Sequence, residues 1–126
     1  MKKYIALALF LPCFCRAEIF INTPQDLQNM NQNLSGDYVL NQNLDLSGMA
    51  FIPIGNQSSP FRGHFDGNGY SISNLTINLP NTRNVGLFGM LGQSAVVDYL
   101  SINNANVVGR VSTGILAGEN ASRFKR

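Results

Sequence analysis

The sequence contains few of the residues from which covalent cross-links and metal sites are built. Tryptophan is absent, histidine occurs once, and the two cysteines, Cys13 and Cys15, both lie before Ala17. The chain after Ala17 therefore has no thiol and no disulfide, which excludes cysteine-based catalysis and cysteine-ligated metals there. A domain of this composition has to close its core by side-chain packing alone.

Charge is scarce as well, at 13% of residues against about 25% in an average globular domain. Residues 18–126 carry six basic and seven acidic side chains, a net charge of −1, and Arg123, Lys125 and Arg126 are three of those six bases. No basic patch remains to neutralise a run of phosphates, so we expect no nucleic-acid partner. The 16 Asn and 12 Gly residues instead favour turns over helices, which predicts an all-β domain.

Apolar residues form no run long enough to cross a bilayer. Residues 4–15 are the longest apolar stretch, and as a helix they would reach about 18 Å, against a hydrocarbon core of about 30 Å. Two lysines precede this stretch, and a small-x-small sequence ending at Ala17 follows it. The pattern predicts a signal peptide over residues 1–17, cleaved after Ala17, and one domain over residues 18–126. We therefore expect a protein that is secreted or held at the cell surface or in the periplasm, with no transmembrane segment.

One short helix is predicted near the start of the domain. Thr23 can cap it, Pro24 suits its first position, and Asp26 can complete a capping box. Leu27 and Met30 then fall on one face of about two turns, which end near residues 31–33.

The rest of the domain is predicted to be short strands separated by corners. Tyr70 and Ile72 alternate in one phase, whereas Leu75 and Ile77 alternate in the other, and a second switch of phase follows at residues 97–102. A flat strand cannot change phase without sending its apolar residues to the wrong face, but a chain that turns a corner can. The pattern favours a parallel β-helix. The strands predicted before the first switch are residues 38–40, 44–46, 51–54 and 61–65.

Two sets of repeats support stacked coils. The first is a series of Leu-x-aliphatic pairs at intervals of roughly 25 to 31 residues, a period typical of repeat architectures. We expect these pairs to stack as rungs, with both members of the second and third pairs buried: Leu44/Leu46, Leu75/Ile77 and Leu100/Ile102. The second set places Gly114 one such interval after Gly86, where glycine would let one coil lie close to the next.

The glycine repeats resemble GLUG motifs of bacterial exported proteins. Val85-Gly-Leu-Phe-Gly89 and Gly114-Ile-Leu-Ala-Gly118 carry the likeness, and residues 36–77 resemble the segment that leads into such motifs. The resemblance covers residues 23–118 and implies a right-handed parallel β-helix of the pectate-lyase-like type, as in adhesins of the filamentous-haemagglutinin sort. It implies a stalk or binding role and no catalysis.

Length is where the sequence departs from that family. Only about three coils fit, and no capping sequence is evident at the carboxyl end beyond the basic tail at residues 123–126. Solenoids need about three repeats and capped ends. We therefore expect a short β-helix with a short N-terminal capping helix. Either the basic tail discourages pairing at the exposed edge, or the chain is truncated at the carboxyl end and able to associate end to end.

No catalytic constellation is evident. Asp37, Asp45, Asp66 and Asp98 occur singly, and the Asp66-Gly-Asn-Gly69 sequence favours an Asx turn. His64 is two positions before Asp66 and could pair with it, and stacking could bring Asp45 near Asp66. We assign no catalytic, cofactor-binding or metal-ligating residue and expect no cofactor. For the asparagines at the predicted corners we favour hydrogen bonds between coils over sugar binding: Asn74, Asn103, Asn104 and Asn106.

Three functions remain open at this stage. The leading hypothesis is an exported, non-catalytic surface or adhesion-type binding module, whose partner is a polysaccharide or a host or cell-surface protein. A carbohydrate-active enzyme of the pectate-lyase type is the alternative from another class, and acid pairs on one face of the coils would favour it. The third is a truncated fragment of a larger adhesin.

Overall fold

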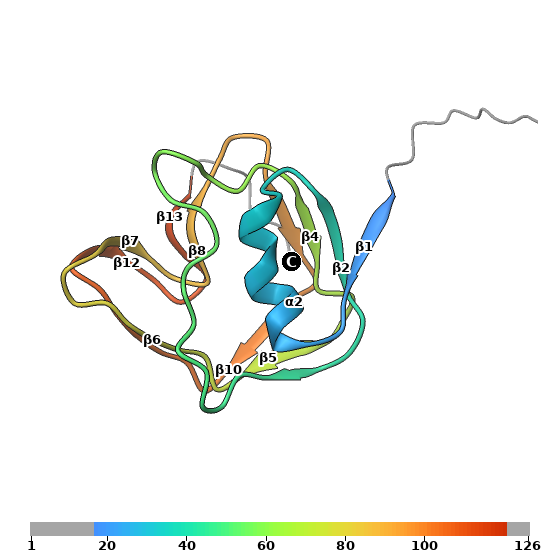
Figure 1. The fold of residues 1–126 in the computed structure, drawn as a ribbon, viewed down its shortest axis with the longest axis horizontal. Helices are drawn as coiled ribbons and strands as arrows, with labels where there is room; N and C mark the ends of the chain where they lie inside the picture. Colours follow the sequence, from blue (N-terminus) through green and yellow to red (C-terminus); the bar gives the residue numbers. More distant parts are fainter. Residues whose placement is uncertain (1–16, 121–126) are drawn as a thin grey trace, which may run out of the picture.

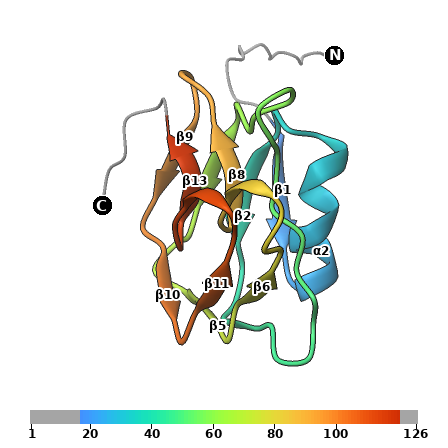
Figure 2. The same ribbon diagram turned by 90° about the vertical axis from the view of Figure 1, so that its left-hand side faces the viewer.

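The computed structural model describes residues 17–120, and of residues 119 and 120 only the backbone. The predicted signal peptide, apart from Ala17, and the basic tail lie outside the described residues. Within them the chain is mostly strands with one short helix, as Figures 1 and 2 show, so the all-β class is confirmed.

The predicted helix is present with its predicted cap. It consists of α2 (Pro24–Gln28), followed by a 3₁₀ turn over Asn29–Gln32. The Thr23 hydroxyl accepts a hydrogen bond from the Asp26 amide at 3.1 Å, and the Asp26 carboxylate accepts one from the Thr23 amide at 3.2 Å. This capping box satisfies amides that have no partner within the helix. Leu27 and Met30 are both fully buried, so the predicted apolar face is correct.

All strand pairs in the described residues are parallel. They form a four-stranded sheet in the order β1-β2-β4-β9, a three-stranded sheet β10-β5-β3, and the pairs β11-β6, β12-β7 and β13-β8. The strands are β1 (Glu18–Ile21), β2 (Asp37–Leu40), β3 (Leu44–Asp45), β4 (His64–Asp66), β5 (Ser71–Ser73), β6 (Thr76–Asn78), β7 (Arg83–Val85), β8 (Phe88–Leu91), β9 (Val96–Asp98), β10 (Ser101–Asn103), β11 (Asn106–Val108), β12 (Val111–Thr113) and β13 (Ala117–Asn120).

Most strands pair with the strand that follows one turn of the chain around the core later. His64 pairs with Val96, and Ile77 pairs with Val107. From β2 onward, partners are thus separated by about 30 residues, a period typical of repeat architectures, whereas β1 pairs with β2 only 19 residues further along the chain. We call residues 37–63, 64–95 and 96–120 the first, second and third coils. In Figure 2 they lie beside one another, with α2 at one end of the stack and β9–β13 at the other. Parallel pairing of consecutive coils fits a β-helix.

Residues in the left-handed region form the corners between strands. Asn74 has φ of 60° in the second coil, and Asn104, at the matching place in the third, has 54°. Asn84 and Ser112 also match, with φ of 58° and 56°, but they lie within β7 and β12 rather than between strands. Asn74 lies where the apolar phase switches, which confirms the predicted corner, and Asn tolerates this conformation better than most residues. Tyr99, with φ of 55°, forms the corner at the second switch.

The predicted rungs were wrong in register. Leu44 pairs with Ile72, and Ile72 pairs with Ile102; Leu75 follows the corner, and its neighbour Ile77 pairs with Val107. The sequence prediction joined apolar pairs from two sides of the stack, because the Leu-x-aliphatic pattern lies on the β3–β5–β10 side in the first and third coils and on the β6 side in the second. Leu100 and Ile102 are also only partly buried, whereas full burial was expected.

Two predicted strands before β4 are shorter than expected. Residues 51–54 contribute a single bridge, Ile54 to Phe88, and Phe61 contributes one to Leu91. The strand proper begins at His64. Their apolar side chains nevertheless enter the core: Phe51, Ile54 and Phe61 are at most 2% exposed.

The core lies between the sheets and combines three phenylalanines with aliphatic side chains. The Phe61 and Phe88 ring centroids are 5.0 Å apart, and those of Phe65 and Phe88 are 6.0 Å apart in an edge-on arrangement. The predicted stacking of the glycine motifs is confirmed, since the Gly114 amide donates to the Val85 carbonyl at 3.0 Å. A Cβ on Gly86 would lie 2.6 Å from the Gly114 oxygen, so only glycine fits there.

Candidate functional site

The outer face of β2, β4 and β9 brings the single histidine together with three aspartates. Alternation along these strands sends Tyr38, Phe65 and Val97 into the core. Their neighbours point outward: Asp37 lies beside His64, and Asp66 is in register with Asp98. We call Asp37, His64, Asp66 and Asp98 the Asp–His face.

His64 lies between carboxylates from the coils on either side. Its Nδ1 is 3.5 Å from Asp37 Oδ1, and its Nε2 is 3.2 Å from Asp98 Oδ1. The His64 side chain is 39% exposed, and those of Asp37 and Asp98 are 19% and 18% exposed, so a solute can reach all three. A neutral imidazole can donate to one of these carboxylates, whereas an imidazolium donates to both.

The sequence left open a pair between His64 and Asp66, and the structure gives both residues other partners. Asp66 Oδ1 accepts a hydrogen bond from the Asn68 amide at 2.8 Å, which is the predicted Asx turn. The histidine instead contacts Asp37 of the preceding coil and Asp98 of the following coil. Asp37 precedes His64 by about one coil, and Asp98 follows it by about one coil. A search of the sequence for charged residues spaced at about the coil period would therefore have found the cluster.

Asp45 does not join Asp66, although the sequence left that open. Asp45 lies in β3 and pairs with Ser73, in a different sheet from Asp66. Its Oδ1 accepts hydrogen bonds from the Asn74 amide group at 2.8 Å and from the Ser47 hydroxyl at 2.5 Å. These bonds favour the carboxylate and lower its pKa to about 2. Asp45 thus fastens the Asn74 corner to the first coil, a structural use of the kind predicted for that asparagine.

A second outer face carries hydroxyl and amide groups. On the sheet β10-β5-β3 the inward residues are aliphatic, and Ser71 and Ser73 are in register with Ser101 and Asn103. Asn43 accepts a hydrogen bond from the Ser71 amide at 2.9 Å. This hydroxyl–amide face has one charge, Asp45, among its six residues: Asn43, Asp45, Ser71, Ser73, Ser101 and Asn103.

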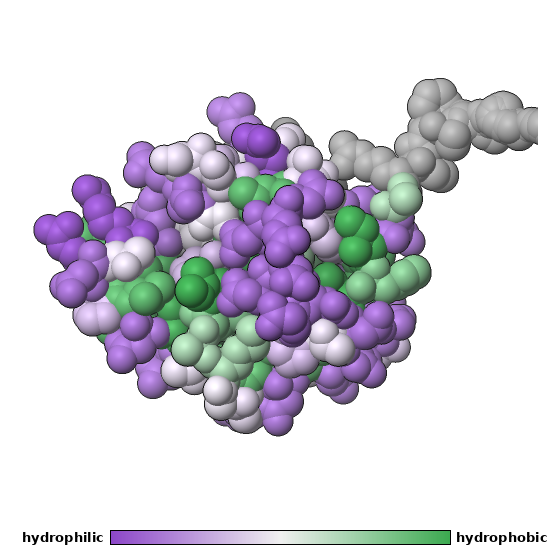
Figure 3. Space-filling model, viewed as in Figure 1, coloured by the Kyte–Doolittle hydropathy of each residue, from purple (hydrophilic) through white to green (hydrophobic). Residues whose placement is uncertain are grey.

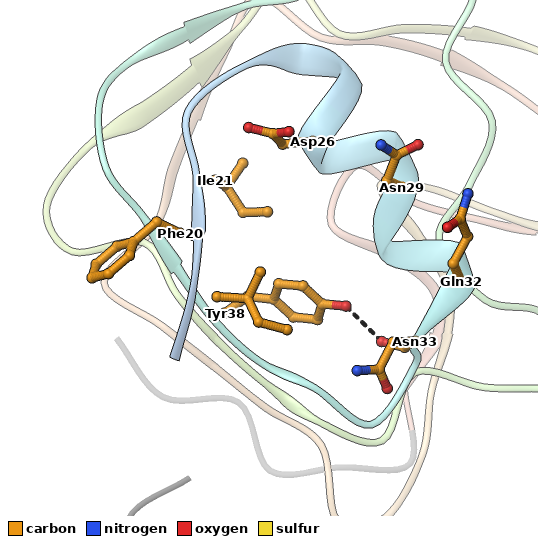
Figure 4. A pocket seen from close by; sticks show the side chains of 8 residues that line it. Phe20, Ile21, Asp26, Asn29, Gln32, Asn33 and Tyr38 are labelled. Atoms are coloured by element: carbon orange, nitrogen blue, oxygen red, sulfur yellow. Dashed lines mark hydrogen bonds between the residues drawn. The ribbon is translucent and has the colours of Figure 1, made fainter. Parts of the chain in front are cut away.

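A groove of about 210 Å³ lies between β1 and α2. Figure 4 shows the Tyr38 ring across it, with the Tyr38 hydroxyl donating to the Asn33 carbonyl at 2.7 Å. Burial raises the pKa of Tyr38, and the Asp26 carboxylate is engaged in the helix cap. Ligand pockets are usually about 300–1,000 Å³, so the groove is small for one and the outer faces are the stronger candidates.

Residues 17–120 offer neither a metal cluster nor a membrane-spanning helix. No group of three or more His, Cys, Asp or Glu side chains in that range is arranged to hold a metal ion. No helix there is long and apolar enough to cross a membrane.

Comparison with known proteins finds similarity to two long chains. The protein is 36% identical over 109 residues to halomucin of Haloquadratum walsbyi, an alignment covering 77% of this chain and 1% of halomucin. It is 32% identical over 115 residues to a putative Gly-rich membrane protein of Evansella cellulosilytica, covering 79% of this chain and 13% of that protein. The chain thus spans a small part of each relative. No family model matches it, and no solved structure does.

Proposed function

We propose that this chain is an exported, non-catalytic β-helical module of the GLUG type that binds polysaccharide at a bacterial surface. The observation that carries the proposal is the hydroxyl–amide face, where small polar side chains from consecutive coils lie in register. Hydroxyl and amide groups donate and accept hydrogen bonds, as the hydroxyls of a neutral polysaccharide do. In-register strands about 4.8 Å apart repeat these groups along the coil axis.

The path of the chain supports a right-handed β-helix. In Figure 1 it runs clockwise from β4 through β5, β6 and β7 to β8, while receding from α2 towards the third coil. This sense agrees with the strong preference of parallel connections for right-handed crossovers. About three coils are present in the described residues, as the length of the chain predicts and fewer than is usual in the family it resembles.

The relatives support a surface location. One is named a membrane protein, and the name of the other, halomucin, indicates a mucin. Both are far longer than this chain, which agrees with a module that occurs within large extended proteins. The predicted cleavage after Ala17 is the step that would deliver the domain outside the cytoplasm.

Binding can be tested by placing charge on the proposed face. Wild-type protein is titrated with neutral and acidic polysaccharides, and the double variant Ser101→Lys/Asn103→Lys is compared with Asn106→Lys/Val108→Lys. The control adds the same charge at the same spacing on the next strand, beyond the Asn104 corner. We expect the first variant to bind neutral polysaccharide about tenfold more weakly, a loss of about 1.4 kcal/mol, and the control to bind as wild type. Equal binding by both variants would contradict the proposed face, and binding only to cell-surface proteins would contradict the ligand class.

The Asp–His face favours a second candidate function, a carbohydrate-active enzyme. Asp66 and Asp98 are in register on adjacent strands, which lie about 4.8 Å apart. Two carboxyl groups about 5–5.5 Å apart serve as nucleophile and acid in retaining glycosidases. An acid pair on one face of the coils is the feature that distinguishes an enzyme from a binding module.

The two functions are separated by looking for products. Polysaccharides are incubated with the protein, with and without Ca²⁺, and new reducing or unsaturated ends are measured. Products that vanish in Asp98→Asn and His64→Gln but persist in Asp45→Asn would establish the enzyme and overturn the non-catalytic module. Asp45 is the matched control because its carboxylate is exposed on another sheet and already bonded to Ser47 and Asn74.

A further inference from the structure

The third coil leaves the end of the core partly uncovered. In the second coil Ile72, Ile77 and Leu87 are at most 1% exposed. The residues that follow them in the stack face the same interior and are only partly buried: Ile102, Val107 and Leu116. Within the described residues, β9–β13 pair with the second coil and with no strand on their other side. We call this surface the open end.

Backbone groups at the open end also point away from the second coil. The Asn106 amide donates to the Leu75 carbonyl at 2.8 Å, and the Val108 carbonyl accepts from the Leu79 amide at 2.9 Å. In a parallel ladder, alternate residues bond to one neighbour and the residues between them face the other side. The N–H and C=O of Val107 therefore face outward from the stack. The same alternation, with bonds from Ser101 and to Asn103, applies to Ile102.

The opposite end of the stack is largely closed to another coil, although β1 and β3 have no strand on their outer side within the described residues. Figure 1 shows α2 lying across it, and Figure 3 shows hydrophilic side chains over α2, with hydrophobic patches on either side of them. The Gln28 side chain exchanges two hydrogen bonds with Ile52, both at 2.9 Å, as a neighbouring strand would. Asn31 likewise bonds the Pro53 carbonyl and the Gly55 amide. These side chains are hydrogen-bonded to backbone groups of residues 52–55 with which a further coil would have to pair.

We propose that the open end binds the open end of a second copy of this chain, which gives a two-fold symmetric dimer. Another open end supplies both an apolar centre and unpaired backbone groups, and strands related by the two-fold axis meet antiparallel rather than parallel. A second copy presents both together only at its own open end, because its other end is covered by α2. The contact is isologous and closes at two copies.

The oligomeric state of the purified chain tests the proposal directly. Light scattering after gel filtration is measured over a hundredfold range of protein concentration. We expect the mass to rise to twice that of one chain, each of 13.8 kDa before any cleavage, and then to stay constant. A single-chain mass at every concentration would overturn the proposal, and so would assemblies that keep growing, since growth requires the end covered by α2.

Adjacent valines on β11 provide a matched pair of variants. Val107 faces the interior and Val108 is 40% exposed on the outer face. Val107→Lys should give a single-chain mass at concentrations where wild type and Val108→Lys are dimeric. Dimers that persist in a folded Val107→Lys variant would contradict the assigned contact.

Hydrogen exchange of the wild type tests the contact even if Val107→Lys does not fold. The amides of Ile102 and Val107 should exchange more slowly at concentrations where the dimer forms. Their rates should fall at least severalfold, while the rate at Ile52, whose amide bonds Gln28, stays constant. Dimer formation without that protection would place the contact elsewhere and overturn the proposal.

Discussion

The end of the stack beside α2 and the open end differ in what covers their backbone hydrogen-bonding groups and their apolar side chains. Beside α2, side-chain amides of Gln28 and Asn31 take the backbone partners that a strand would supply, and the underlying core is fully buried. At the open end the corresponding side chains are partly buried and β9–β13 have one paired side. A helix with two well-placed amides can thus replace a strand at the end of these stacked strands. Where no such helix lies, the edge stays available for pairing.

The largest effect is expected from a pair of leucines at corresponding places in the glycine motifs. Leu87 is 0% exposed in the second coil, whereas Leu116 is partly buried in the third. Leu87→Ala should lower the free energy of unfolding by about 2–5 kcal/mol, through lost burial and a cavity. Leu116→Ala should cost about 1 kcal/mol, because solvent already reaches its site. Urea denaturation at a concentration where the protein is a single chain measures both, and equal losses would show that the two coils do not differ in burial.

The next effect tests whether α2 replaces a strand. The double variant Gln28→Ala/Asn31→Ala removes the hydrogen bonds to residues 52–55. We expect the free energy of unfolding to fall by about 2 kcal/mol, because water can hydrogen-bond to some of the backbone groups that lose their side-chain partners. Gln32→Ala, in the adjoining 3₁₀ turn and exposed, is the control and should change little. Hydrogen exchange should also speed up at Ile52 and Gly55, whose amides donate to these side chains. Unchanged exchange there would mean that the amides do not protect the edge.

Much of this architecture was predictable, because local physics determines it. Thr23 and Asp26 indicate the helix cap, the change of apolar phase at Asn74 marks a corner, and the recurrence of the glycine motif indicates the stacking of Gly86 and Gly114. The register of Leu44, Leu75 and Leu100 was not predictable, since the leucine pattern lies on one side of the stack in the first and third coils and on another in the second. Cross-coil pairing depends on the length of each coil, and this varies along the chain.

The candidate site was missed for a related reason. Asp37, His64 and Asp98 are isolated in the sequence, and no local motif joins them. The three residues lie in consecutive coils, and the stacking of the coils places their side chains next to one another. The Asx turn at Asp66, by contrast, was predictable, because its partner Asn68 is only two positions away.

A smaller effect is expected at the helix cap. Thr23→Ala removes the hydroxyl that accepts from the Asp26 amide, and loss of such a cap costs about 1 kcal/mol. Thr82→Ala, an exposed threonine in a turn of the second coil, serves as the control. Thermal denaturation followed by circular dichroism compares them. If both variants unfold at the same temperature as the wild type, the end of the stack beside α2 is held closed by Gln28 and Asn31 rather than by the start of the helix.

The smallest effect concerns Asp45, whose carboxylate fastens the first coil to the second by accepting a hydrogen bond from Asn74. Its pKa is about 2, below the ordinary value of 3.8, chiefly because Asn74 and then Ser47 donate hydrogen bonds to the carboxylate. The unfolded chain therefore takes up the proton at higher pH than the folded chain does. The stabilisation is complete above about pH 4 and is lost as the pH falls through about 2. Carboxyl chemical shifts measured by NMR against pH should give this low titration midpoint. In Asn74→Gly, which keeps the left-handed corner accessible but removes the main donor, the midpoint should rise towards 3.8. A wild-type midpoint already near 3.8 would show that the Asp45–Asn74 bond does not hold the two coils together in solution.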